Sequence, residues 1–162
     1  MMSHTDNAVV INAALDDVWE LTNDLSRWPQ LFTEYAAVEI LEQRGASFRF
    51  RLTMHPDENG NAWSWVSERT LDAERRSVRA NRIETGWFEY MRIAWTYEEI
   101  DGGTRMNWSQ DFSMRADSPV DDETMTERIN RNTVIQQAHI KDVVERLVIG
   151  RHFGRHAAVP TV

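Results

Sequence analysis

Residues 63–70 bring an arginine and a serine onto the same face as two tryptophans. Side chains alternate between the two faces of a strand, so a strand here would carry on one face Trp63, Trp65, Ser67 and Arg69. An arginine keeps its charge inside a protein, and an unpaired buried charge is costly. We expect Arg69 to reach water at a strand end, to pair with a carboxylate such as that of Glu89, or to face a cavity that holds a polar ligand.

A guanidinium held in an apolar cavity would bind carbonyl oxygens and stabilise negative charge that develops on them. Two other polar side chains are candidates for a functional role. Tyr35 follows a short helical segment, and Gln110 alternates with Trp108 and Phe112. Structural roles are the alternatives: Tyr35 as a loop anchor, Gln110 as a satisfied core amide, and the seven tryptophans as plain core packing.

Composition excludes several other kinds of site. The chain has no cysteine, and its five histidines show no metal-ligand spacing, so we expect no metal and no nucleotide cofactor. A net charge of −8 disfavours binding to nucleic acid or anionic membranes. No apolar run approaches the ~18 residues of a membrane span. The polar start lacks a signal pattern, so we expect a cytoplasmic protein.

The length of 162 residues fits one domain, which we place at residues 1–150. The pattern at its start predicts a strand over residues 5–12 and a helix over residues 14–23, with Asn12 as its N-cap. A second short helix would follow, capped by Ser26 and with Pro29 in its first turn.

A period of two then predicts six further strands, over residues 38–41, 48–54, 63–70, 77–85, 87–99 and 105–114. Turn signals between them, at Asn59-Gly60 and at Asp101-Gly102-Gly103, indicate consecutive hairpins. From Asp121 to Gly150 the period becomes helical. We expect an α+β fold in which a curved seven-strand antiparallel sheet is wrapped around this helix and encloses a cavity. Residues 151–162 are predicted to be a flexible tail.

Several strings resemble a known family, and the resemblance extends to about residue 147. They include Val10-Ile11-Asn12-Ala13, Trp28-Pro29, His55-Pro56-Asp57-Glu58-Asn59-Gly60, the run from Trp63 to Arg69, Glu84-Thr85-Gly86 and Gly103-Thr104-Arg105-Met106. The layout resembles the START-type helix-grip superfamily. More narrowly, the chain resembles the monodomain aromatase/cyclases of bacterial type II polyketide synthases, of the tetracenomycin and spore-pigment type. It departs from them at Trp87, where relatives carry proline.

This resemblance implies a reaction without a cofactor: aldol closure of the first ring of a linear poly-β-ketone, followed by dehydration to an aromatic ring. It implies an acyl carrier protein as the partner that bears the substrate, with the ketosynthase/chain-length-factor complex as a further partner, in antibiotic or spore-pigment biosynthesis. It implies Arg69 and Tyr35 as catalytic residues. The substrate-binding positions it implies are Trp28, Phe32, Trp65, Ser67, Met91, Trp95, Trp108 and Gln110.

Two other functions remain open from the sequence. A protein of this fold could bind or carry a lipid, quinone or pigment without catalysis, because fold does not determine function. It could also be an interaction protein with a filled core. Arg82 is a candidate for a second arginine in the cavity.

Overall fold

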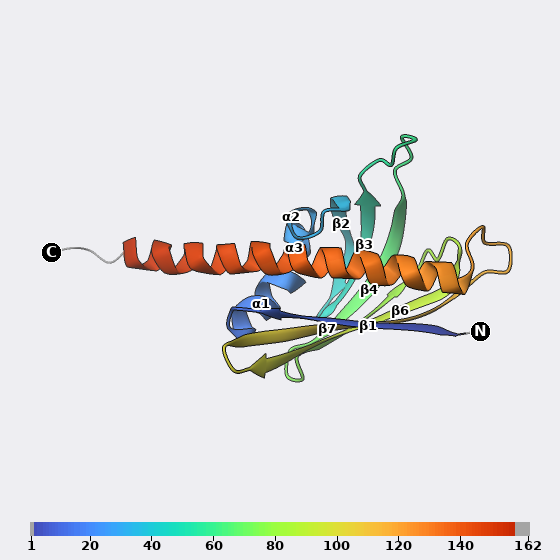
Figure 1. Cartoon of the computed structure of the whole chain (residues 1–162). Helices are drawn as coiled ribbons and strands as arrows, with labels where there is room; N and C mark the ends of the chain where they lie inside the picture. The colour runs from blue at the N-terminus through green and yellow to red at the C-terminus, as the bar shows by residue number, and fades with distance from the viewer. Residues whose placement is uncertain (1, 158–162) are drawn as a thin grey trace.

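The computed structural model describes residues 2–157, which fold into one sheet and a few helices (Figure 1). In chain order the elements are β1 (Ser3–Ile11), α1 (Leu15–Asn23), the 3₁₀ helix η1 (Leu25–Arg27), α2 (Trp28–Leu31), β2 (Tyr35–Arg44), β3 (Ser47–Met54), β4 (Ser64–Asp72), β5 (Ser77–Arg82), β6 (Phe88–Ile100), β7 (Gly103–Met114) and α3 (Asp122–Ala157). The predicted α+β helix-grip fold is confirmed.

The seven strands form one antiparallel sheet in the order β1-β7-β6-β5-β4-β3-β2. From β2 to β7 each strand pairs with the next along the chain, as the hairpin signals predicted. The turn between β6 and β7 has Gly102 at a φ of 83°, a conformation that costs glycine little. β1 closes the order by pairing with β7.

Helix α3 lies lengthwise across the sheet (Figure 1). It buries Ile140 and Val144 completely, and its Gln137 donates a 2.9 Å hydrogen bond to the carbonyl of Asn7 in β1. The prediction that this helix covers the sheet is therefore correct.

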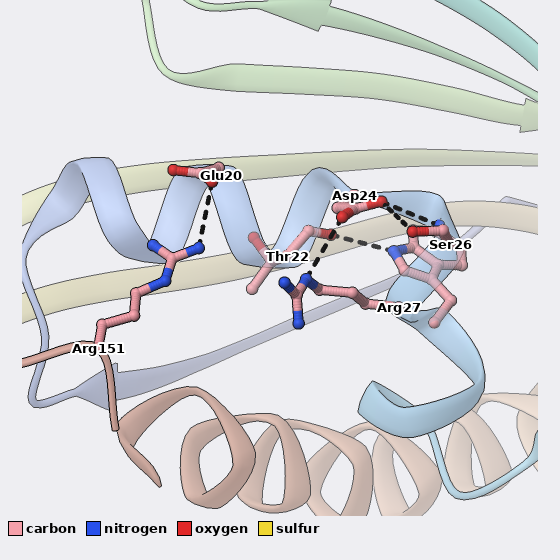
Figure 2. Close-up of polar contacts among 7 residues, drawn as sticks. Glu20, Thr22, Asp24, Ser26, Arg27 and Arg151 are labelled. Atoms are coloured by element: carbon pink, nitrogen blue, oxygen red, sulfur yellow. Dashed lines mark hydrogen bonds and ion pairs between the residues drawn. The ribbon is translucent and has the colours of Figure 1, made fainter. Parts of the chain in front are cut away.

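The predicted end of that helix is wrong, because α3 continues past Gly150 to Ala157. A solvent-exposed glycine costs a helix only about 1 kcal/mol, and ion pairs offset that cost one residue later. Arg151 lies 3.2 Å from Glu20 (Figure 2) and 3.2 Å from Asp17, both in α1. Residues 158–162 of the predicted tail lie outside the described part of the chain.

Both predicted helix caps are also wrong. The N-cap of α1 is Ala14, which makes no side-chain cap, while the backbone N–H of Asn12 donates to Glu145 of α3. Asp24 caps η1 in place of Ser26: its carboxylate accepts from the backbone N–H and from the hydroxyl of Ser26, at 3.1 and 2.6 Å (Figure 2). The carboxylate lies two residues earlier and can accept both hydrogen bonds, so the Ser26 hydroxyl serves as a donor.

A β-bulge interrupts the alternation of side chains between the two faces of β6. Alternation alone places Phe88 and Met91 on opposite faces, yet both are buried. Phe88 pairs with Met114 and Tyr90 with Ser113, so Glu89 is an extra residue in β6, and the strand reverses its faces there. Trp63 and Trp87 were predicted as the first residues of two strands, but they precede β4 and β6 and are 54% and 44% exposed.

Candidate functional site

A cavity of about 180 Å³ lies between α2, the inner face of the sheet and α3. Its lining includes all ten predicted site residues: Trp28, Phe32, Tyr35, Trp65, Ser67, Arg69, Met91, Trp95, Trp108 and Gln110. The structure therefore brings these side chains together, although they come from α2, the segment after it and four strands. Their catalytic and binding roles stay predictions. A filled core is contradicted by this cavity.

The cavity adjoins a wider outer hollow of about 820 Å³. Tyr35, Trp65 and Arg82 line both spaces. The outer hollow is also lined by Trp63 and Trp87. Trp87, the position at which the chain departs from the family that it resembles, thus lies outside the inner cavity, in the outer hollow that leads to it.

Stacked aromatic rings form the walls of the inner cavity. Trp95 and Trp108 are nearly parallel, with ring centroids 4.4 Å apart and an interplanar angle of 10°. Phe32 stacks on Trp108 at 5.7 Å, and Trp28 stacks on Trp95 at 5.9 Å. Such surfaces favour flat, conjugated ligands.

Arg69 in β4 lies against these walls and is only 2% exposed. Its guanidinium carbon lies 4.1 Å from the ring centroid of Trp95 and 5.1 Å from that of Trp28. Its Nη2 donates a 2.6 Å hydrogen bond to Oδ1 of Asn23 at the end of α1. Burial lowers the pKa of Arg69 to about 10, so the group remains a cation at neutral pH. Of the three expectations for Arg69, the one realised is a guanidinium facing a cavity; Glu89 is exposed and is not its partner.

Tyr35 is the first residue of β2, and its ring stacks on that of Trp28 at 6.0 Å. Burial, helped by the negative charge of Glu34, raises the pKa of Tyr35 well above 10. The hydroxyl is therefore protonated at neutral pH and acts as a hydrogen-bond donor.

Glu34 is a functional candidate that sequence reasoning missed. Its side chain lines both the cavity and the outer hollow. Its carboxylate accepts a 3.1 Å hydrogen bond from Asn132 of α3 and lies beside the side chain of Tyr35. Burial raises the pKa of Glu34 above its ordinary value. Its place next to Tyr35 at the end of the helical segment was the available signal.

Helix α3 fixes the segment that carries Phe32, Glu34 and Tyr35. The amide of Gln136 accepts from the Thr33 backbone N–H at 2.9 Å and donates to the Thr33 hydroxyl at 2.7 Å. The buried face of α3 thus contains a polar clamp in addition to apolar contacts.

Arg82 in β5 lies between the inner cavity and the outer hollow. Its guanidinium carbon lies 4.5 Å from the Trp65 ring centroid and 5.2 Å from that of Phe88. Its Nε donates to the backbone carbonyl of Glu84 at 3.2 Å. Burial lowers the pKa of Arg82 to about 10, so a second cation lines the cavity, at its junction with the outer hollow.

Among the side chains that the structure describes, residues 2–151, no group of three or more acidic, histidine or cysteine residues is arranged to hold a metal ion. Over the same residues, none of the helices combines the length and apolar character that a bilayer span requires.

Comparisons with known proteins agree with this geometry. A protein of Streptomyces cyaneus named "Putative polyketide cyclase" is 58% identical over 147 residues, which are 91% of this chain and 97% of that protein. A protein of Streptomyces halstedii with the same name is 56% identical over 108 residues, or 67% of this chain and 99% of that one.

Solved structures extend the similarity to the fold. The Zhui aromatase/cyclase from Streptomyces sp. R1128 superposes with a TM-score of 0.82 at 27% identity, over 91% of this chain and 96% of that one. A START superfamily protein from Mycobacterium smegmatis has the same fold, with a TM-score of 0.74 at 16% identity over 89% and 98% of the two chains.

Residues 11–137 match the family described as "Polyketide cyclase / dehydrase and lipid transport". This match spans most of the chain and includes all ten predicted site residues. The resemblance inferred from the sequence is thereby confirmed, and the chain belongs to the polyketide cyclase/dehydrase and lipid transport family.

Proposed function

We propose that this protein is an aromatase/cyclase that closes and aromatises the first ring of a linear poly-β-ketone. The observation that carries the proposal is the Arg69 cation, which is 2% exposed and lies against parallel tryptophan rings in a cavity. Negative charge develops on carbonyl oxygens during aldol closure, and a fixed buried cation stabilises that charge more strongly than water does.

Cavity size favours closure of a ring at one end of the chain. Sites that take up a whole ligand usually measure ~300–1,000 Å³, whereas the inner cavity measures about 180 Å³. A long poly-β-ketone would place one folded end in this cavity and leave the remainder in the outer hollow of about 820 Å³. Holding the reacting carbons together in this way is catalysis by proximity.

Glu34 and Tyr35 carry out the proton transfers, and Arg69 stabilises the negative charge. Glu34, with a pKa raised by burial, accepts a proton from a methylene between two carbonyls. The resulting enolate carbon bonds to a carbonyl carbon, and Arg69 stabilises the oxyanion. The oxyanion takes back the proton that Glu34 removed and becomes a hydroxyl. Tyr35 is protonated and donates its proton to this hydroxyl as it departs, and the tyrosinate takes up a second C–H proton, so that one water leaves and Tyr35 is restored. Enolisation of the remaining carbonyls gives the aromatic ring, and no oxidant is consumed.

The substrate would be delivered as a thioester on an acyl carrier protein, with the ketosynthase/chain-length-factor complex nearby. The outer hollow supports this proposal, because it gives a tethered chain a route to the inner cavity. Binding or carrying a lipid, quinone or pigment without catalysis is the second candidate. The exposed Trp63 and Trp87 of that hollow favour it.

A reconstituted synthase tests the proposal. The purified protein is added to a ketosynthase, chain-length factor and loaded carrier protein, and products are separated by chromatography. An aromatase/cyclase replaces the mixture of spontaneous products with one compound whose first ring is aromatic. An unchanged product mixture, together with recovery of an unaltered bound ligand, would instead establish the carrier function.

A further inference from the structure

Asn23 holds the Arg69 guanidinium by a hydrogen bond, but the Asn23 side chain carries no charge that would neutralise this cation. Its Oδ1 accepts the 2.6 Å hydrogen bond from Nη2 of Arg69. Most other arginines of known pairing meet carboxylates: Arg76 pairs with Asp16, and Arg51 pairs with Glu84. Arg69 differs from them: it is buried in the cavity wall, and its hydrogen-bond acceptor is neutral.

A network behind Asn23 fixes the orientation of its amide. The Nδ2 group donates to the Trp19 carbonyl at 2.9 Å and to the Tyr97 hydroxyl at 3.3 Å. Both hydrogens of the amide are thus engaged, and only its oxygen remains for Arg69. The opposite amide orientation would direct N–H groups at a cation, so the network selects the observed one.

The hydroxyl of Tyr97 is itself held in one direction. It lies 2.7 Å from Oγ1 of Thr22, and that hydroxyl donates to the Val18 carbonyl at 2.7 Å. Tyr97 must therefore donate to Thr22 and accept from Asn23. Burial raises the pKa of Tyr97, so this group adds no negative charge near Arg69.

Two buried donors of the cavity wall still lack acceptors among the described residues. They are Nε of Arg69 and Nε1 of Trp108. Both side chains line the same cavity and are at most 4% exposed. Buried donors are normally paired, so these two indicate a ligand that brings acceptor oxygens.

We propose that Asn23 is a positioning residue that keeps Arg69 fixed but electrically uncompensated, and that the cavity consequently selects flat conjugated oxyanions, namely enolates and phenolates, over neutral molecules of the same shape. This proposal rests on the proposed function for its relevance to catalysis, since an enolate is the first intermediate of that reaction. As a binding property it stands on the hydrogen-bond network alone.

Two matched probes test the proposal without any turnover. The anion of para-nitrophenol absorbs visible light, so bound anion can be followed by absorbance and by calorimetry; para-nitroanisole has a similar shape and no charge. The wild type should bind the anion at least about tenfold more tightly than the anisole, since a charged hydrogen bond is stronger than a neutral one.

Asn23→Asp is the decisive variant, because its carboxylate would pair with Arg69 and cancel the charge. It should lose about tenfold or more in affinity for the anion while its affinity for the anisole is retained. Tyr97→Phe, which frees the amide, should lose about fivefold for the anion only. Asn81→Asp makes the same chemical change on the exposed face of β5 and should bind both probes normally.

Retained anion preference in Asn23→Asp would overturn the proposal. Loss of both probes would overturn it as well, because Asn23 would then maintain the shape of the cavity and not the charge of Arg69. If the wild type prefers the anion but forms no aromatic product in the reconstituted synthase, the proposed function fails while this inference stands.

Discussion

The Arg69 guanidinium and the Asn23 amide oxygen are joined by a 2.6 Å hydrogen bond across 46 residues of sequence. The acceptor is neutral, and the surrounding rings of Trp28 and Trp95 provide only their faces. Desolvation is therefore the main influence on the pKa of this arginine, which falls to about 10. A protein that needed only a stable core would gain little from such a group.

Replacing Arg69 with an apolar residue should preserve or raise the stability of the fold and should lower the activity. A buried cation with a lowered pKa destabilises the fold at every pH below about 10, and an apolar residue of similar volume removes that cost. Arg69→Met should melt at the same temperature as the wild type or higher, while product formation falls by about 10²–10³-fold. Calorimetry and product assays measure the two effects.

Arg76→Met serves as the comparison, because Arg76 pairs with Asp16 outside the cavity. It should bring no gain in melting temperature and no loss of product. If Arg69→Met instead melts several degrees lower than the wild type, the idea of a destabilising cation is wrong.

The Tyr35 hydroxyl should matter as a proton donor and hardly at all for folding. Tyr35→Phe keeps the ring that stacks on Trp28 and Phe32, so the melting temperature should change by only a few degrees. Loss of a general acid should slow aromatisation by about 10²–10⁴-fold. The rate of water loss, followed by mass spectrometry of carrier-bound intermediates, measures this. An unaltered dehydration rate would exclude the role.

Glu34 should control the acidic side of the pH–rate profile. Its pKa is raised by burial, so activity should fall as the pH drops through that raised pKa and the carboxylate becomes protonated. Glu34→Gln should be slower by about 10²-fold at neutral pH and should lack this acidic limb. An acidic limb that persists unchanged in the variant would assign it to another group.

Ionisation of Glu34 should also lower the stability of the fold. A carboxyl with a raised pKa contributes stability that is fully present below its unfolded pKa and is lost as the pH rises through its folded pKa. Glu34→Gln removes a partly buried negative charge at neutral pH and keeps an acceptor for Asn132. Chemical unfolding at neutral pH should therefore show a variant at least as stable as the wild type.

The junction of β1 and β7 should tolerate no added methyl group. A Cβ at Gly103 would lie 2.4 Å from the carbonyl oxygen of Ile11, which is backbone and cannot give way. Gly103→Ala should lower the free energy of unfolding by about 2–4 kcal/mol, as measured by urea denaturation. Gly150→Ala is the matched control: the space around Gly150 in α3 is open, so it should stabilise the protein by about 0.5–1 kcal/mol. Equal effects of the two changes would contradict this account.

Alternation along strands was sufficient to place Ser67 and Arg69 on the inner face, because a strand directs every second side chain to the same side. The family resemblance supplied Trp28, Phe32 and Tyr35, which no period connects to the sheet. All of these residues line the cavity.

The features that sequence could not provide depend on contacts between distant segments. Asn23 looks like an ordinary residue at a helix end, and its partner in β4 is evident only once the chain is folded. Glu34 looks like a surface carboxylate until Asn132 of α3 is seen to hold it. The extra residue Glu89 reverses the faces of β6 through strand pairing, which a local pattern does not contain.

The product profile of an Arg69→Gln variant in the reconstituted synthase tests the central claim most directly. Glutamine keeps an N–H donor, but it lacks the charge and is two bonds shorter than arginine. The account predicts that the wild type yields one compound with an aromatic first ring, whereas the variant yields the spontaneous mixture. If Arg69→Gln forms the wild-type product at the wild-type rate, a buried cation does not drive this ring closure.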